Sequence, residues 1–467
     1  MRANLEIGAI GLGALMAALA QTLVIPVLPV IEADLRSSTT ESQWLLTSTL
    51  LVAAVSVPIV GRLADMFGRR LMLLVALSCL FVGSLICALT SNIDVMIFGR
   101  ALCGVSSAAI PLGISLLATV LPPERRGSAT ALISAMLGIG GALGLPLAGL
   151  LADNVDYHAL FWIGAVGGAA SAVAVLLLVE EPAQRSGGAI DWYGMVLLAT
   201  GLVALVLPLS QASSWGWGSA RVLGLLVASA LLLGLLVVVE RRVVSPLVDM
   251  RTLGRPPILI TNVASIFFGF ALFASFVGTA TYVQMPEATG YGFGASVLVA
   301  GLCLLPSGIL MLLLAPVTAR LSVAWGAARV LSLAGLILVV GLVFRIVFVD
   351  ALWQVVVGTA IIGAGTGIGY ATLPTLINSH APAAELAAAN GINTLARSLG
   401  STLASAIGGT LLASITMDLG GVAVPSLAAF RVLFAICAGA ALVASLAGLL
   451  LTSSRVDRPQ DLEPALP

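Results

Sequence analysis

The sequence has 467 residues, of which 60% are hydrophobic and only 9% are charged, and its formal net charge is zero. Its mean hydropathy of +1.13 excludes a soluble fold of this size, which would need many more charges to cover its surface. The balanced charge gives no sign of nucleic acid as a partner, and all 21 basic residues are arginine, so a Walker phosphate loop and a lysine Schiff base are both excluded.

Apolar stretches close to the roughly 20 residues that a helix needs to cross a bilayer recur along the whole chain. They predict an all-α polytopic membrane protein, because the strands of a membrane barrel would be short and alternating. We expect the first stretch to be a retained helix rather than a signal peptide. The fourteen predicted transmembrane helices are residues 5–31, 43–64, 71–91, 94–120, 127–151, 159–179, 191–211, 221–239, 258–283, 293–319, 328–348, 352–376, 388–416 and 431–452.

The distribution of arginine between these spans predicts how the chain is oriented. If both termini lie on one side, the segments on that side carry fifteen arginines, whereas the opposite segments carry only Arg36, Arg221 and Arg431. Cytoplasmic segments of membrane proteins are the arginine-rich ones. We therefore expect a multi-pass protein of the cell membrane, in contact with the lipid bilayer, with both termini in the cytoplasm.

Two pairs of short segments indicate an internal duplication. GRLADMFGRR at residues 61–70 and ARLSVAWGAAR at 319–329 share an Arg-Leu pair followed five residues later by glycine, and the glycine spacing of 99–104 returns at 358–363. Such repeats are typical of secondary transporters that rock around a central site, and the alternative of a chance echo remains open. The predicted parts are an N-terminal six-helix bundle (1–182), an inserted helix pair with linkers (183–256), a C-terminal six-helix bundle (257–453) and a cytoplasmic tail (454–467).

With these features the chain resembles the major facilitator superfamily, and within it the fourteen-span drug/proton antiporters. The GRLADMFGRR stretch is similar to the superfamily's loop signature, although Met66 stands where an arginine is usual. The resemblance implies a clasp at the cytoplasmic ends of neighbouring helices that holds one of two states. The residues that it assigns to gating and proton coupling are Gly61, Asp65, Gly68, Arg69, Arg70 and Arg100.

Arg100 and the fifth predicted helix carry two further parts of this resemblance. Arg100 with Gly104 is similar to the arginine motif of the fourth helix, with Cys103 where glutamine is common. In the fifth helix Gly140, Gly144 and Pro146 resemble the glycine-proline motif of antiporters, but Leu145 separates the last two. Read without the family, the same residues predict close helix packing and a kink.

The first predicted helix departs from the family pattern, since Ala20 stands where these antiporters usually carry an acidic residue. No acidic residue lies well inside any predicted span, whereas Arg100 and Arg397 do. A core with buried arginine and no compensating carboxylate should repel a permanent cation and accept an anion or a neutral amphiphile.

Several neutral polar and aromatic residues are candidates for a substrate cavity, although each alone is more often a packing contact between helices. The polar residues within or near spans include Asn378 and Asn390. The residues that we select as cavity candidates are Gln21, Thr22, Thr47, Asn262, Phe267, Phe270, Asn393 and Arg397.

These observations predict an exporter of antibiotics or related amphiphilic small molecules that is driven by proton antiport. The alternative is an uptake permease or uniporter without proton antiport, which the missing acid at Ala20 favours. We expect no enzyme activity, because no reactive residues cluster at membrane depth, and no cofactor or metal, because His158 and His380 stand apart from other ligands. The expected partners are a small-molecule substrate, protons and lipid, and we expect a monomer.

Overall fold

The computed structural model describes residues 2–152, 156–182, 190–243 and 246–453, so the predicted tail at 454–467 lies outside the described residues. The elements are α1 (Arg2–Thr22), η1 (Ile25–Val27), α2 (Leu28–Leu35), α3 (Thr39–Phe67), α4 (Arg69–Leu89), α5 (Ile93–Gly104), η2 (Val105–Ala108), α6 (Ala109–Val120), α7 (Pro123–Ala152), α8 (His158–Leu178), α9 (Trp192–Trp215), α10 (Ala220–Glu240), α11 (Met250–Leu253), α12 (Pro256–Gln284), η3 (Glu287–Thr289), α13 (Val297–Trp325), α14 (Ala327–Val347), α15 (Leu352–His380), η4 (Ala383–Glu385), α16 (Leu386–Ser414), β1 (Thr416–Leu419), β2 (Val422–Pro425) and α17 (Leu427–Ser453).

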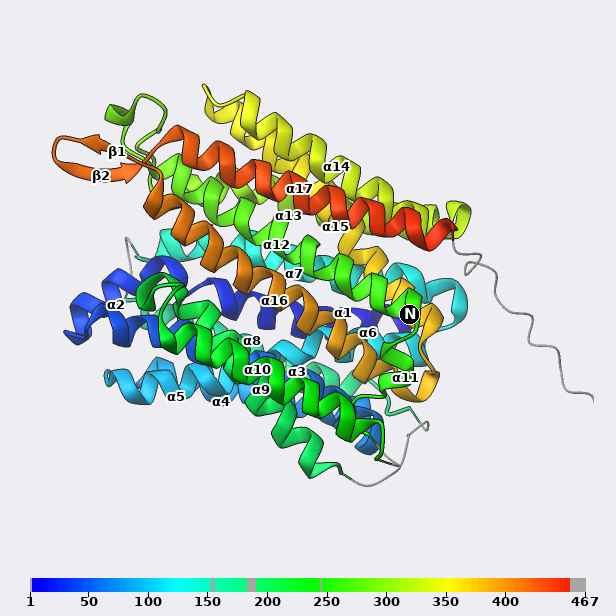
Figure 1. The fold of residues 1–467 in the computed structure, drawn as a ribbon. Helices are drawn as coiled ribbons and strands as arrows, with labels where there is room; N and C mark the ends of the chain where they lie inside the picture. Colours follow the sequence, from blue (N-terminus) through cyan, green and yellow to red (C-terminus); the bar gives the residue numbers. More distant parts are fainter. Residues whose placement is uncertain (1, 153–155, 183–189, 244–245, 454–467) are drawn as a thin grey trace, which may run out of the picture.

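The long helices form one bundle (Figure 1). Thirteen spans in the described part are long and apolar enough to cross a membrane, with α5 to α6 counted as one, and the equally long but more polar α16 makes a fourteenth. Each of these fourteen corresponds to a predicted span, so the all-α polytopic fold is confirmed. The N-terminus and α11 lie at one end of the bundle and the β1–β2 hairpin at the other (Figure 1).

Side chains that accept hydrogen bonds from backbone amides define where many of these helices begin. Ser38, Asn92, Asp191, Ser219 and Ser296 cap α3, α5, α9, α10 and α13 in this way. A cap satisfies amides that have no partner within the first turn of a helix, which matters most where water is scarce. The spans are therefore separated by polar residues that favour new helix starts.

Two predicted spans are interrupted in the structure, and a β-hairpin that was not predicted follows α16. The span 5–31 ends as a helix at Thr22 and continues as η1 and α2, because Pro26 and Pro29 lack an amide hydrogen and restrict the residue before them. The span 94–120 contains the 3₁₀ turn η2. After α16 the chain forms an antiparallel hairpin in which Thr416 pairs with Pro425 around two glycines of positive φ, a geometry typical of a tight hairpin turn.

The two echoing segments of the sequence adopt the same backbone structure. Gly68 (φ 125°) joins α3 to α4 and Gly326 (φ 85°) joins α13 to α14, both in a conformation that favours glycine. The second echo also holds, because a Cβ on Gly104 would lie 2.6 Å from the carbonyl oxygen of Thr49, and one on Gly363 would lie 2.5 Å from that of Ser307. The same helix crossings therefore occur in both halves of the chain.

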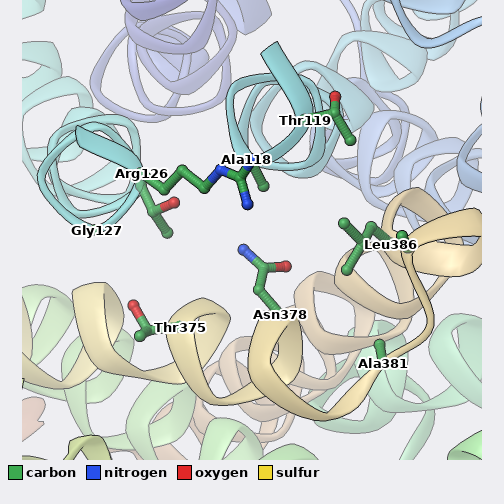
Figure 2. A pocket seen from close by; sticks show the side chains of 10 residues that line it. Ala118, Thr119, Arg126, Gly127, Thr375, Asn378, Ala381 and Leu386 are labelled. Carbon is green, nitrogen blue, oxygen red and sulfur yellow. The ribbon is translucent and has the colours of Figure 1, made fainter. Parts of the chain in front are cut away.

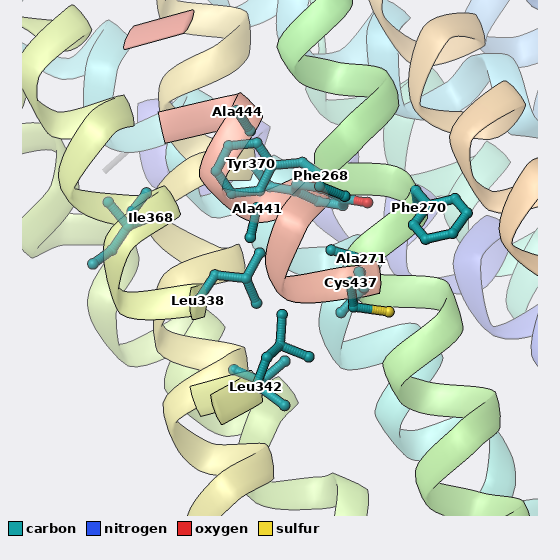
Figure 3. Packing of buried hydrophobic residues seen from close by; sticks show 14 of the residues in the cluster. Phe268, Phe270, Ala271, Leu338, Leu342, Ile368, Tyr370, Cys437, Ala441 and Ala444 are labelled. Atoms are coloured by element: carbon teal, nitrogen blue, oxygen red, sulfur yellow. The ribbon is translucent and has the colours of Figure 1, made fainter. Parts of the chain in front are cut away.

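Helices α1 and α3 to α8 pack among themselves, as do α12 to α17. In the second set, side chains of α12, α14, α15 and α17 form a buried core that includes Phe268, Leu338, Tyr370 and Cys437 (Figure 3). The two sets meet along α7 and α13 and along α3 and α16, and α9 packs on its neighbour α10 and on both α3 and α16. A change in the relative position of the halves would therefore alter the contacts along these seams.

Candidate gate between the two halves

Asp65 lies in the last turn of α3 and is 2% exposed. Arg69, one helical turn later in α4, donates to its Oδ1 atom from Nε at 3.0 Å and from Nη2 at 2.8 Å. A buried carboxylate needs such charge-assisted hydrogen bonds, because burial removes its hydration. The glycine turn at Gly68 brings the two side chains together.

Asp65 also reaches across the seam to α16, which belongs to the other set of helices. The amide of Ala387 donates to Oδ1 at 3.2 Å and the amide of Ala388 donates to Oδ2 at 2.9 Å. Both amides lie in the first turn of α16, where the helix dipole favours a negative charge. One carboxylate therefore links the Arg69 side chain of the first half to the backbone of α16 in the second half.

Arg69 makes a second connection across the same seam. Its Nη2 donates to the carbonyl oxygen of Ala383 at 2.7 Å, and its Nη1 donates to that of Ser115 in α6 at 3.3 Å. Gly61 allows this close approach, because a Cβ there would lie 2.8 Å from the carbonyl oxygen of Ala387. We call Gly61, Asp65 and Arg69, together with the first turn of α16, the clasp, and we call this end of the bundle the Asp65 end.

Arg70 does not take part in the clasp. Its Nη2 donates to the carbonyl oxygen of Leu176 at 2.7 Å, within the first half. Glu181, which the sequence analysis did not select, accepts from the amides of Arg70 at 3.3 Å and Leu71 at 3.0 Å and so caps α4. A Cβ on Gly68 would lie 2.7 Å from this carboxylate, so Gly68 belongs to the same contact.

Arg100 is buried between three helices of the first half. Its Nη1 donates to the carbonyl oxygen of Ala20 in α1 at 2.8 Å, and its Nε donates to that of Leu45 in α3 at 3.3 Å. Its Nη2 has no hydrogen-bond partner within the described part of the chain. The backbone of Ala20 therefore contacts this cation at the position where the resembled family carries an acid.

The glycines of α7 lie in tight contacts between helices. A Cβ on Gly140 would lie 2.4 Å from the Cβ of Ala18, and one on Gly144 would lie 2.0 Å from Oγ1 of Thr22. Pro146 lies against Gly301 of α13, on the other side of the seam. The motif thus fits α7 between α1 and α13.

The candidate cavity residues do not form one cluster but lie at several different helix contacts. Asn393 donates to Asn262 Oδ1 at 3.0 Å and accepts from Arg397 Nη1 at 3.0 Å, and the Arg397 guanidinium lies 5.2 Å from the ring centroid of Tyr370. Thr47 pairs with Gln211 of α9. Of the remaining candidates, Gln21 donates to Ser107, and Thr22 donates to the carbonyl oxygen of Gly140. Phe270 is buried and Phe267 is partly buried.

A cavity of about 310 Å³ lies beside the clasp, between α6 and α7 of the first half and α15 and α16 of the second. The guanidinium of Arg126 and the amide of Asn378 face each other across it (Figure 2). Thr119, Thr130 and Thr375 add hydroxyl groups to its lining. Of these residues the sequence analysis named only Asn378, since the others sit near predicted span ends without a distinguishing pattern.

Arg345 is a buried residue that the sequence analysis overlooked, although its charge inside the predicted span 328–348 was a visible signal. It is 0% exposed, and its guanidinium lies 5.1 Å from the ring centroid of Tyr282 and 5.2 Å from that of Phe434. None of its three nitrogens has a hydrogen-bond partner among the described residues. The second half therefore holds two buried arginines.

Comparison with known proteins identifies a family with a similar sequence and architecture. The chain matches the model of the Major Facilitator Superfamily over residues 10–403 and again over 267–466. It is 29% identical over 420 residues to the tetracenomycin C resistance and export protein of Streptomyces glaucescens (88% of this chain, 76% of that protein). It is also 29% identical over 413 residues to the multidrug resistance protein Stp of Mycobacterium tuberculosis (87% and 75%).

Two further similarities concern length and fold. An uncharacterized MFS-type transporter of Mycobacterium tuberculosis is 31% identical over 420 residues, and the matched region spans 88% of this chain but 60% of that protein. The crystal structure of the human organic anion transporter MFSD10 (TETRAN) is similar with a TM-score of 0.67 over 96% of this chain and 99% of that chain, and at 15% identity the likeness concerns the fold alone. The family match over most of the chain, with its paired sets of helices, shows that the protein belongs to the Major Facilitator Superfamily, a family of transporters rather than enzymes.

Proposed function

We propose that this transporter exports antibiotics or related amphiphilic small molecules across the cell membrane by proton antiport. The observation that carries the proposal is the clasp, in which Asp65 accepts from the first turn of α16 in the other half and Arg69 donates to Ala383 in η4, just before that helix. A hydrogen bond to a charged group contributes about 1.5–3 kcal/mol, so a few such bonds can hold one state and still be exchanged. The resistance and export proteins among the relatives support the substrate class.

In this proposal the Asp65 end faces the cytoplasm, with both termini, because the arginine-rich segments lie on that side. The halves, residues 1–182 and 257–453, rock about a site between them. Breaking the clasp opens the cytoplasmic end, and re-forming it closes that end behind the substrate. The cavity between Arg126 and Asn378, beside the clasp, is where a cytoplasmic substrate would first meet both halves.

A second candidate is an uptake permease or uniporter without proton antiport. It is favoured by Ala20, whose carbonyl oxygen rather than an acid contacts Arg100. Under this alternative the same clasp would open and close, but the proton gradient would not drive it.

Everted membrane vesicles separate the two candidates. Proton-driven export predicts that vesicles containing the protein accumulate a fluorescent amphiphile when their lumen is acidified, and that an ionophore abolishes the accumulation. Accumulation that is indifferent to the ionophore would remove proton antiport and leave the second candidate.

The variant Asp65→Asn tests the clasp in the same assay. We expect slower transport at an unchanged level of protein in the membrane, because an amide group cannot replace the charge-assisted bonds to Arg69 and to the α16 amides. Transport at the wild-type rate would show that the clasp does not gate the cycle.

A further inference from the structure

Two acidic side chains of the inserted helix pair meet at the Asp65 end. Asp191 caps α9, and Glu240 is the last residue of α10. A Cβ placed on Gly194 would lie 2.5 Å from Asp191 Oδ2 and also 2.5 Å from Glu240 Oε1, so both carboxyl groups border the same point in space. Like charges this close oppose each other's ionisation.

The burial of Glu240 makes this close approach of two carboxyl groups unusual. Glu240 is 2% exposed, and its carboxyl oxygens accept no hydrogen bond of normal geometry from the described residues, although the backbone amides of Leu247 and Val248 lie near enough to attract them. Asp191 accepts from the amide of Gly194 at 2.8 Å through Oδ1, while its Oδ2 is buried without a partner in the same part of the chain. A buried carboxylate without hydrogen bonds is costly, and a bound proton removes that cost.

The ends of the two helices decide which carboxyl group takes the proton. Asp191 sits at the N-terminus of α9, where the helix dipole and the Gly194 amide stabilise a negative charge. Glu240 sits at the C-terminus of α10, where the dipole disfavours a negative charge. Of the two carboxyl groups, Glu240 is therefore the one placed to take up a proton.

The groups that face Glu240 connect it to the clasp. Asp191 repels its negative form, whereas Arg62 of α3 and the backbone amides of Leu247 and Val248 attract it. Arg62 adjoins Gly61, the residue whose close approach to α16 the clasp requires. A change of charge on Glu240 therefore changes the field on α3 beside the gate.

We propose that Asp191 and Glu240 form a proton-binding site, in which the ionised Glu240 takes up one proton to become a neutral carboxylic acid and returns it to water on the cytoplasmic side. Proton release restores the attraction between Glu240 and Arg62 and so biases the end of α3 that carries the clasp. The role in transport rests on the proposed proton antiport, whereas proton binding itself does not.

Infrared difference spectroscopy of the purified full-length protein, recorded while the pH is stepped, tests proton binding directly. The wild type should show the absorption of a protonated carboxyl group that disappears on raising the pH, and Glu240→Gln should lose this signal. Glu124→Gln is the matched control, because Glu124 is an exposed carboxylate at the start of α7, and it should leave the signal unchanged.

A second variant keeps the test decisive if Glu240→Gln folds poorly. Asp191→Asn retains a capping oxygen but removes the like charge, so the carboxyl signal should disappear at a lower pH than in the wild type. A signal that survives in Glu240→Gln, or that stays at the same pH in Asp191→Asn, would overturn the proposed site.

The vesicle assay then decides the role in transport. Glu240→Gln should lose the ionophore-sensitive accumulation of the fluorescent amphiphile and keep its downhill movement. Full ionophore-sensitive accumulation in this variant would overturn the role. If the wild type itself shows no ionophore sensitivity, proton antiport fails as the function, and the infrared experiment still decides whether the site binds a proton.

Discussion

Asp65 and Arg69 supply hydrogen bonds between the two halves at this end of the bundle. One carboxylate accepts from an arginine of its own half and from two backbone amides of the other, and the arginine donates to carbonyl oxygens in both halves. Because most of these partners are backbone atoms, the clasp constrains the type of residue mainly at Gly61, Asp65, Gly68 and Arg69. This explains why the short GRLADMFGRR stretch was informative while its partners in α16 were not.

Arg69→Lys should slow transport more than Arg70→Lys does. A lysine carries a single ammonium group and cannot reach Asp65, Ser115 and Ala383 with the fork of a guanidinium, and each lost hydrogen bond to a charged group costs about 1.5–3 kcal/mol. Arg70 is the matched control, since its side chain donates to Leu176 within the first half. Initial rates of amphiphile uptake into vesicles measure the difference, and equal rates in the two variants would contradict it.

At the residue scale, the sequence singled out Asp65 and Arg69, whose side chains the structure brings together, and Arg100 and Arg397, which it buries, while their role in gating stays a proposal. It did not reveal Glu181, because a carboxylate that caps α4 from more than a hundred positions away leaves no local pattern. Arg345 was detectable in principle, yet its surroundings, Tyr282 and Phe434, come from separate helices that only packing brings together. Local patterns predict which residues are unusual, and tertiary structure decides what they touch.

At the scale of the elements, composition and charge were enough to locate all fourteen spans, because lipid requires long apolar helices with polar connections. The break after Thr22 and the hairpin after α16 were missed. Both depend on proline and glycine acting on backbone geometry inside stretches that remain apolar. The sequence also shows the small residues at which helices can pack closely, but it does not show which helix packs against which.

Gly140→Ala should lower the thermal stability of the purified protein, and Gly141→Ala should not. The new methyl group at Gly140 would lie 2.4 Å from the Ala18 Cβ and 3.0 Å from the Leu19 amide nitrogen, and such overpacking costs about 1–3 kcal/mol. At Gly141 it would meet only Phe276 at 3.5 Å, an ordinary contact. The melting temperature followed by intrinsic fluorescence checks this, and a lower value for Gly141→Ala than for Gly140→Ala would contradict it.

At the scale of the whole molecule, the distribution of buried charge predicts which substrates pass. Arg100, Arg345 and Arg397 are buried, and Asp65 is already engaged by Arg69 and by α16. A permanent cation between the halves would meet buried positive charge with little to offset it. Anionic and neutral amphiphiles would meet no such repulsion.

A resistance assay with anionic, neutral and cationic compounds of similar size checks this expectation. We expect protection against anionic and neutral compounds and at least about tenfold less against quaternary ammonium compounds, since ~1.4 kcal/mol of repulsion changes affinity by that factor. Preferential protection against the quaternary ammonium compounds would contradict the prediction and would point to a carboxylate in the substrate path.

Helix α9 binds both halves toward the end of the bundle remote from Asp65. Gln211 donates to Thr47 in α3 at 3.2 Å, and Trp217, just beyond the helix, donates to Thr410 in α16 at 2.7 Å. Any motion that separated α3 from α16 at this end would have to break one of these two hydrogen bonds or bend α9 between them. In such a motion α9 would act as a strut that limits how far this end of the bundle can open.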